Sequence, residues 1–313
     1  MMSRQAHPYT QYWDTQGTRV IECQECGFKH VDPLPSAEQL TAYYRDHYYQ
    51  QVKPFNYGAV TTEYLQRNIT RTLQNQQYRN TYEKTVELLR EKGTTNRVLL
   101  DIGAGNSILA VLYQHEGWRC VVVEPNAEAA DFLRKHRLDV IERYVYDMTQ
   151  FADDTFDFIN LRFVLEHIVN PIKMIQEICR VLKPGGVFRV CVPNDFSVGQ
   201  LAYHEYVGND EIPWVATPDH INYFTFESMN RLLERCGLLE SYRTTTFPVE
   251  LLLLGGIDYY NNKEESSKVG AFIKHFQNAW EQTGRLAQLN QWYDSLAHMG
   301  MGRSVEIYAR KME

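Results

Sequence analysis

The sequence predicts an α/β protein built on a doubly wound sheet, with a small N-terminal cap module and a helical C-terminal insertion. Three features of residues 98–124 predict this fold. An apolar run over 98–102 enters a loop with two glycines, a helical pattern follows over 107–116, and a second apolar run covers 119–123. Strand, tight turn, helix and strand together form the first unit of a nucleotide-binding α/β domain.

The loop after the first strand has the residues that a bound ligand requires. Gly103 and Gly105 lie in the turn, where a Cβ would hold the backbone away from a ligand. Asp101 precedes the turn. Glu124 ends the second strand, where its carboxylate can accept hydrogen bonds from two ribose hydroxyls. The loop and the two acids together predict a nucleoside-containing cofactor.

The class of cofactor depends on the third position of the loop motif. A dinucleotide fingerprint has the form G-x-G-x-x-G, so that the pyrophosphate can bind at the helix N-terminus. Here Ile108 occupies the third glycine position. Asp101 would also repel phosphate oxygens, whereas it suits a cation such as a sulfonium ligand with an α-amino group. A nicotinamide-dependent oxidoreductase is therefore the disfavoured alternative.

Further segments continue the pattern downstream. They are a strand over 156–161, a loop and helix start over 164–171, a turn over 180–186 into a strand over 187–194, the segment 218–225, and a closing strand over 301–309. In order and spacing, most of residues 78–311 resembles the class I S-adenosylmethionine-dependent methyltransferases. The segment 218–225 is similar to one found in a subset of that family, many of whose members act in sugar or natural-product tailoring.

The resemblance implies a Rossmann-like methyltransferase sheet, S-adenosylmethionine as cofactor, and roles for particular residues. Asp101 would place the amino group of the cofactor directly or through water, Glu124 would bind the ribose, and Pro125 would also belong to the cofactor site. The methionine portion would lie against Gly103, Ala104, Gly105, Leu161 and Arg162. For adenine, stacking on Tyr146 or N6 recognition by Asp147 stands beside the alternative of a plain surface turn.

Three residues are candidates for the base in methyl transfer. Glu166 and His167 are adjacent and can serve as a base, although His167 can equally hold its loop by hydrogen bonds. Some family members bind a divalent ion with an extra acid three residues earlier, where this chain has Phe163. His220, with Asp219 beside it, is expected over the mouth of the site, as a base or as a structural histidine.

The N-terminal residues contain one cysteine knuckle. Cys23 and Cys26 form half of a four-ligand zinc site, and a short hairpin is expected around them. Many relatives carry a second Cys-x-x-Cys upstream, which is missing here. His7 and His30 can complete a Cys2His2 set, but a packed hairpin without zinc is the preferred interpretation.

The chain is expected to divide into two parts. Residues 1–60 form the N-terminal cap module, and residues 61–313 form the methyltransferase domain, with an insertion over 247–301 as a candidate substrate cover. In the cap, Ser36 and Gln39 predict a capped helix. Packing is the expected use of Tyr43, Tyr44, Tyr48 and Tyr49, with contact to substrate as the alternative. A helical region is expected over 61–89, and Pro171 and Thr225 are expected to open further helices. Trp280, Trp292 and Tyr293 are expected to be exposed in the insertion.

Composition limits the function further. The 313 residues are 44% hydrophobic and 23% charged, which is ordinary for a globular protein, and the net charge of −7 disfavours a nucleic-acid partner. The longest apolar stretch, 249–257, is far short of the ~20 residues that span a bilayer. Six cysteines without a disulfide framework predict a cytoplasmic protein.

Together these features predict S-adenosylmethionine-dependent methyl transfer to a hydroxyl or amine of a small molecule, such as a sugar or secondary metabolite. Proximity and charge stabilisation would do most of the catalysis. A protein that binds the cofactor without catalysing transfer remains an alternative, because the sequence assigns no single base.

Overall fold

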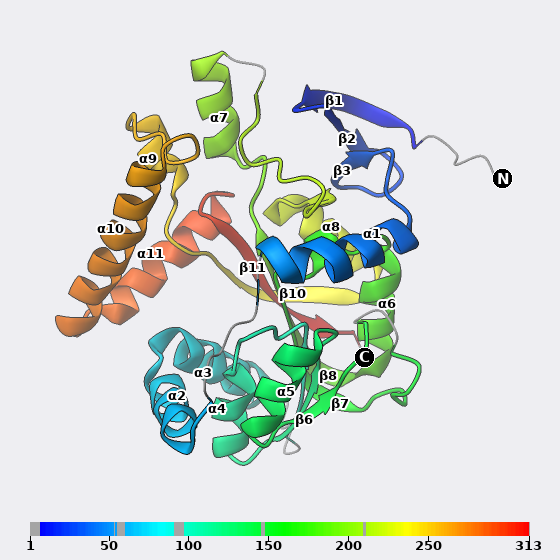
Figure 1. The fold of residues 1–313 in the computed structure, drawn as a ribbon, viewed down its shortest axis with the longest axis vertical. Coiled ribbons are helices and arrows are strands. Elements are labelled where there is room, and N and C mark those ends of the chain that lie inside the picture. The colour runs from blue at the N-terminus through cyan, green and yellow to red at the C-terminus, as the bar shows by residue number, and fades with distance from the viewer. Residues whose placement is uncertain are drawn as a thin grey trace. The chain divides into compact units, whose positions relative to one another are not determined.

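The structure, a computed structural model, describes residues 7–52, 54, 60–90, 97–144, 148–208 and 211–312 (Figure 1). The strands are β1 (Tyr9–Thr15), β2 (Thr18–Cys23), β3 (Lys29–Asp32), β4 (Val98–Ile102), β5 (Arg119–Val123), β6 (Asp139–Ile141), β7 (Phe156–Arg162), β8 (Leu182–Pro193), β9 (Asn222–Tyr223), β10 (Leu238–Thr244) and β11 (Ser304–Lys311). The helices are α1 (Ala37–Tyr43), α2 (Thr62–Gln74), α3 (Gln76–Arg90), α4 (Leu109–His115), α5 (Ala127–Lys135), α6 (Pro171–Val181), α7 (Val198–Val207), α8 (Phe226–Arg235), α9 (Glu250–Leu254), α10 (Lys263–Gln282) and α11 (Leu286–His298). A π-helical segment, η1, covers Tyr44–Val52, and a short 3-10 helix, η2, covers Leu165–His167.

The larger sheet has seven strands in the order β10-β11-β8-β7-β4-β5-β6. Strand β4 pairs in parallel with β5 on one side and with β7 on the other, and β5 pairs in parallel with β6. The chain therefore winds outward in both directions from β4, which confirms the doubly wound α/β fold. In such sheets ligands bind at the carboxyl ends of the strands where the winding direction changes, here β4 and β7.

The strand-turn-helix unit forms as expected, with a small shift of the helix. Leu99, Leu100 and Ile102 are buried in β4. Helix α4 begins at Leu109 instead of residue 107, because the backbone N–H of Ser107 donates to the carbonyl of Ala104 and closes a turn first. The glycine loop is thus longer than the sequence pattern indicates.

The helical region expected over 61–89 is two helices. Asn75 has an extended backbone, with φ −70° and ψ 111°, and ends α2. Its side-chain oxygen accepts a hydrogen bond from the N–H of Tyr78, which caps α3. A capping asparagine at the junction is the physical reason for the break.

The other expected helix starts are confirmed. Ser36 and Gln39 form a reciprocal capping box at α1. Pro171 is the first residue of α6, and Asn170 caps that helix by accepting from the N–H of Lys173. The hydroxyl of Thr225 accepts from the N–H of Ser228 at the start of α8.

The chain divides into two compact units. The first comprises residues Met1–Leu34, Cys191–Leu232 and Tyr242–Ile307, and the second comprises Pro35–Val190, Leu233–Ser241 and Tyr308–Glu313. The expected cap of residues 1–60 therefore falls partly in each unit. The first unit contains a four-stranded sheet in the order β1-β2-β3-β9, and β2 and β3 form the expected hairpin around the cysteine knuckle.

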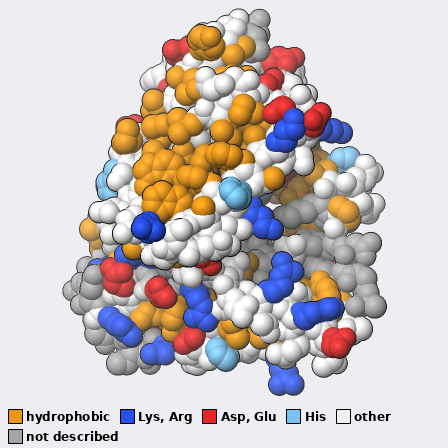
Figure 2. All heavy atoms as spheres, turned by 90° about the vertical axis from the view of Figure 1, so that its left-hand side faces the viewer, with side chains coloured by type: hydrophobic (Ala, Val, Ile, Leu, Met, Phe, Trp, Pro, Cys, Tyr) orange, Lys and Arg blue, Asp and Glu red, His pale blue; other side chains and the backbone are white. Residues whose placement is uncertain are grey.

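The insertion of the first unit is helical, as expected, and comprises α9, α10 and α11. The prediction that its aromatic residues are exposed is wrong for Tyr293, which is buried together with Phe247 and Leu289. Trp280 and Trp292 are partly buried against this cluster. Apolar side chains also gather on the outer face of these helices (Figure 2). Among the described residues, no helix is both long and apolar enough to span a bilayer.

Candidate cofactor and acceptor site

The glycine loop lies at the end of β4 in the second unit. Gly103 has φ +68° and Gly105 has φ +58°, which is the left-handed region that glycine adopts without strain. The N–H of Gly103 donates to the carbonyl of Val123 at 2.7 Å. A Cβ on Gly103 would lie 2.5 Å from Cγ2 of Val164, so this position needs glycine for packing as well as for its backbone angle.

Glu124 ties this loop to the end of β5. Its side chain is 2% exposed, and its two carboxylate oxygens accept hydrogen bonds from the N–H of Gly105 at 2.7 Å and the N–H of Asn126 at 2.9 Å. The sequence predicted a role in ribose binding only, and the bond to Gly105 adds a structural role. A carboxylate offers about four acceptor positions in all, so these two backbone bonds do not by themselves prevent Glu124 from accepting from a ligand.

Asp101 is part of a buried polar chain that sequence reasoning missed. Oδ1 of Asp101 accepts from the amide of Asn160 at 2.6 Å, and the amide oxygen of Asn160 accepts from Arg189 at 2.6 Å. These three residues come from the neighbouring strands β4, β7 and β8, and Asp101 lies opposite Asn160 in the ladder. The sequence signal for each partner was a polar residue between two apolar neighbours, within Ile159–Leu161 for Asn160 and within Phe188–Val190 for Arg189.

Burial dominates the electrostatics of Asp101. It raises the pKa of the carboxyl to about 6, although the amide of Asn160 and the charges of Arg189 and Arg162 act in the opposite direction. Within the described ranges, Oδ2 of Asp101 has no hydrogen-bond partner. A buried acceptor without a partner is costly, which indicates a site for a donor.

A small cavity of about 40 Å³ lies beside Asp101. Gly103, Ala104, Asn160 and Arg162 also line it. Its size suits ordered water better than a ligand group, so of the two roles expected for Asp101 the water-mediated one fits this cavity. Arg162 is exposed, with its guanidinium 4.2 Å from the ring centroid of Phe163. Leu161 is fully buried in β7.

A larger cavity of about 430 Å³ opens beside the glycine loop in the same unit. Gly103, Gly105, Glu124 and Pro125 contribute to its wall, so the structure brings these four predicted residues together. The rest of the wall is mainly apolar and aromatic, with Tyr44, Tyr48, Tyr49, Tyr144, Phe163, Val164, His167, Ile168, Lys173 and Met174 among its residues. The volume falls in the range of small-molecule sites, about 300–1,000 Å³.

The tyrosines in this wall were expected mainly to pack, with contact to substrate as the alternative. Tyr44, Tyr48 and Tyr49 come from η1, and the ring of Tyr44 meets the ring of His167 edge-on with 5.9 Å between centroids. Four tyrosines within seven residues were the sequence signal. Which of them reach a cavity depends on the π-helical turn, and no local pattern predicts that turn.

Glu166 and His167 both lie in η2, after β7. Glu166 is 2% exposed, and its Oε1 lies 3.9 Å from Nε2 of His167. This distance permits an electrostatic interaction but exceeds a hydrogen bond. Of the pair, His167 is the one that lines the large cavity.

His220 belongs to the first unit. Asp195 Oδ2 lies 3.9 Å from its Nδ1, and Asp219 Oδ2 lies 3.9 Å from its Nε2. Asp195 is buried and accepts a hydrogen bond from Arg303 at 3.0 Å. Sequence reasoning identified Asp219 but missed Asp195, which is distant in the chain. His220 therefore has a carboxylate near each ring nitrogen.

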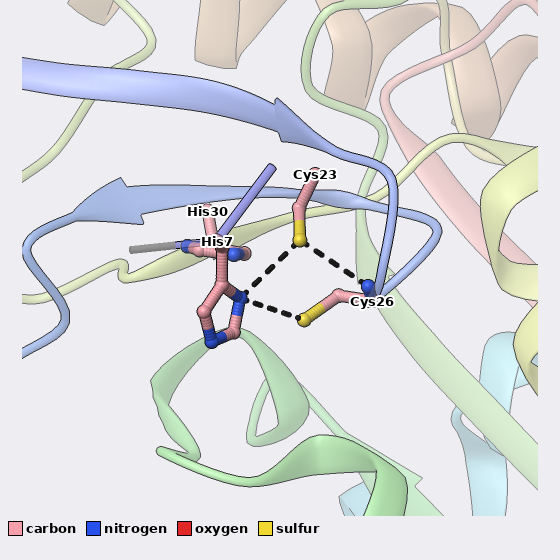
Figure 3. Close-up of side chains that lie close together, drawn as sticks. All are labelled: His7, Cys23, Cys26 and His30. Atoms are coloured by element: carbon pink, nitrogen blue, oxygen red, sulfur yellow. Dashed lines mark hydrogen bonds between the residues drawn. The ribbon is translucent and has the colours of Figure 1, made fainter. Parts of the chain in front are cut away.

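Two further predictions concern adenine and metal binding. Tyr146 and Asp147 lie outside the described residues. Cys23 and Cys26 lie in the first unit with His7 and His30, and the donor atoms of these four side chains are all within 4.8 Å of one another (Figure 3).

Comparisons with known proteins identify the family. Residues 72–239, more than half of the chain, match a family model described as a methyltransferase domain. A thiol S-methyltransferase of Rattus norvegicus, TMT1B, is 33% identical over 129 residues, which cover 37% of this chain and 52% of that protein. A ubiquinone biosynthesis O-methyltransferase of Actinobacillus pleuropneumoniae is 30% identical over 108 residues, which cover 31% of this chain and 46% of that protein. The chain thus spans about half the length of these curated relatives.

The chain also aligns with solved structures of methyltransferases, at low sequence identity and with TM-scores below 0.5. The Burkholderia thailandensis 1,6-didemethyltoxoflavin N1-methyltransferase, solved with 1,6-didemethyltoxoflavin and S-adenosylhomocysteine, is 14% identical, with a TM-score of 0.48 over 98% of this chain and 100% of that one. A methyltransferase from Archaeoglobus fulgidus is 18% identical, with a TM-score of 0.45 over 74% of this chain and 94% of that one. The family model, the parallel sheet and the glycine loop bonded to Glu124 agree: the chain belongs to the class I S-adenosylmethionine-dependent methyltransferases.

Proposed function

We propose that this protein transfers the methyl group of S-adenosylmethionine to a hydroxyl or amine of a small molecule. One observation supports this most strongly. Gly103, Gly105 and Glu124, the residues expected to hold the cofactor, share one cavity with an aromatic wall that includes Tyr48 and His167. A cofactor and an acceptor bound there would be neighbours.

The residues present fit the cofactor. Glu124 lines the cavity beside the glycine loop, and a carboxylate is the group that ribose hydroxyls donate to. Gly103 and Gly105 line the cavity and have no side chain, so the methionine portion can approach their backbone. The buried Oδ2 of Asp101 lacks a donor among the described residues, and an ammonium group reaching it through water would supply one.

The cofactor supplies an electrophilic methyl group on a sulfonium. The chain would bind and orient the acceptor, exclude water, and accept the proton that the acceptor loses. Aromatic and apolar side chains line the cavity and can hold a ring or hydrophobic body. His167 in the cavity wall, with Glu166 nearby, and His220, with its two carboxylates, are the candidates for the proton acceptor.

The curated relatives favour a small acceptor. One is named for thiol methylation and the other for O-methylation in ubiquinone biosynthesis. The net charge of −7 likewise gives no support to a polyanionic substrate.

Calorimetric titration tests the cofactor assignment. We expect S-adenosylmethionine to bind wild-type protein and to bind Glu124→Ala about tenfold more weakly or worse, because a charged acceptor is lost. Glu128→Ala, an exposed change in α5, is the matched control and should bind like wild type. Preference for NAD(H), or equal binding by Glu124→Ala, would contradict the assignment.

Methyl transfer to a panel of small hydroxyl, amine and thiol compounds tests the reaction. We expect transfer with at least one class, and a larger loss of turnover than of cofactor affinity in His167→Ala or His220→Ala, because a base acts in the reaction step. Tight cofactor binding without product from any class would favour the silent binding protein instead.

A further inference from the structure

Four side chains with metal-binding atoms converge in the first unit (Figure 3). His7 precedes β1, Cys23 ends β2, Cys26 lies in the knuckle, and His30 lies in β3. We propose that they bind one Zn²⁺ in a closed Cys2His2 site, through Sγ of both cysteines, Nδ1 of His7 and Nε2 of His30. A metal-free hairpin, the interpretation preferred from the sequence, does not account for the following contacts.

The position of His7 fits a tetrahedral ion. Its Nδ1 lies 3.3 Å from Sγ of Cys23 and 3.5 Å from Sγ of Cys26. Dashed lines mark both contacts in Figure 3. Zinc bonds of about 2.3 Å to sulfur and about 2.0–2.1 Å to nitrogen place neighbouring N and S ligands about 3.5 Å apart in a tetrahedron. One ring nitrogen carries either one proton or one lone pair, so an ordinary two-centre hydrogen bond explains only one of the two contacts. A shared cation explains both.

His30 presents its other nitrogen to the same cluster. The side chain is 1% exposed, and Nδ1 lies 2.9 Å from the carbonyl oxygen of Val31, so Nδ1 carries the proton. The lone pair is then on Nε2, which is buried and has no hydrogen-bond partner in the described part of the chain. A backbone carbonyl that fixes the tautomer is a usual partner of a zinc-bound histidine.

The turn between the cysteines has the geometry of a metal knuckle. Gly27, with φ +82°, donates its N–H to the carbonyl of Cys23 at 3.0 Å. The N–H of Cys26 points at Sγ of Cys23 from 3.2 Å. Backbone N–H donors directed at sulfur stabilise a thiolate, the form that binds metal.

Four protein ligands leave no open coordination position, so the role is structural. His30 lies opposite Asn222 in the pairing of β3 with β9, and the N–H of Val31 donates to the carbonyl of Ile221. The zinc would therefore hold β3 in place, and β3 is the strand that pairs with β9, two residues after His220. Its removal should loosen the β1-β2-β3-β9 sheet.

Metal analysis of the full-length protein is the first test. Protein purified from zinc-supplemented cells should retain about one zinc per chain. Cys26→Ser and His30→Gln should each lose most of this metal. Cys179→Ser and His298→Gln, which change the same residue types but not members of the cluster, should retain it.

Cobalt binding to the wild-type protein is a second test, which does not depend on whether a variant folds. Chelator-stripped wild-type protein should bind Co²⁺ with tetrahedral visible bands and a thiolate charge-transfer band, and Zn²⁺ should displace both. Added zinc should also raise its melting temperature. Absence of retained zinc together with absence of the cobalt bands would overturn the proposal. A spectrum unchanged in His30→Gln would overturn the assignment of His30 as a ligand.

Discussion

Replacing Asp101 by asparagine should make the free energy of unfolding of the protein less dependent on pH. Asp101 is fully buried, and burial raises its pKa from 3.8 to about 6. The folded state therefore holds the proton more tightly than the unfolded state. The stability that this carboxyl contributes is fully present below about pH 3.8 and is lost as the pH rises through about 6.

The magnitude follows from the rise in pKa. One pKa unit corresponds to about 1.4 kcal/mol, so the carboxyl lowers the free energy of unfolding by about 3 kcal/mol between pH 3.5 and pH 8. About half of this loss falls between pH 5 and pH 8. The amide introduced by Asp101→Asn cannot ionise, while its carbonyl oxygen can still accept from Asn160. The NH2 group of that amide replaces Oδ2 and needs a partner of its own, which adds a cost that does not change with pH.

The measured quantity is therefore the difference in the free energy of unfolding between Asp101→Asn and wild type, followed as a function of pH. In urea unfolding followed by intrinsic fluorescence, the free energy of unfolding of the variant should rise by about 1.5 kcal/mol relative to that of wild type from pH 5 to pH 8. Glu83→Gln, an exposed change within α3, is the control for which no such trend is expected. A difference that stays constant, or that moves in the opposite direction, would refute the assignment of a buried, proton-retaining Asp101.

Two further predictions concern the framework of the second unit. Lys183→Met should lower the free energy of unfolding by about 2–3 kcal/mol, because it removes the ion pair of the fully buried Asp157. Among the described residues, Oδ2 of Asp157 would then keep only the hydrogen bond from the N–H of Val98. Urea unfolding measures the change, and an unchanged free energy of unfolding would contradict it. Gly103→Ala should cost about 1–3 kcal/mol, since its φ is +68° and its Cβ would meet Val164. Adding Val164→Ala should restore the steric part only, and a double mutant cycle without coupling between the two sites would show that the close approach is unimportant.

Local sequence patterns predicted most of the second unit's framework. The apolar runs of β4 and β5, the capping box at Ser36 and Pro171 at the start of α6 all appear where expected. Each depends on neighbours within a few residues, because alternation, helical periodicity and caps act over one or two turns. Asn75 carried such a local signal too, but its role as a cap became clear only from the backbone angles.

Local and distant contacts together bring the residues of the predicted cofactor site to one place. The sequence placed Gly105 and Glu124 after consecutive strands, and parallel pairing brings the ends of those strands to one edge. It did not predict that Glu124 accepts from the N–H of Gly105. That bond depends on how the loop closes, which side-chain periodicity does not specify.

By itself, therefore, the sequence determined the doubly wound fold, the glycine loop with its acids and the family to which the chain belongs. Only the tertiary structure decided that Asn160 and Arg189 reach Asp101, since that chain of bonds requires three strands in a particular order and register. It also decided that His7 and His30 meet the cysteine knuckle. Such contacts join residues far apart in the chain, and they form only when packing and strand pairing fix the backbone positions from which the side chains project.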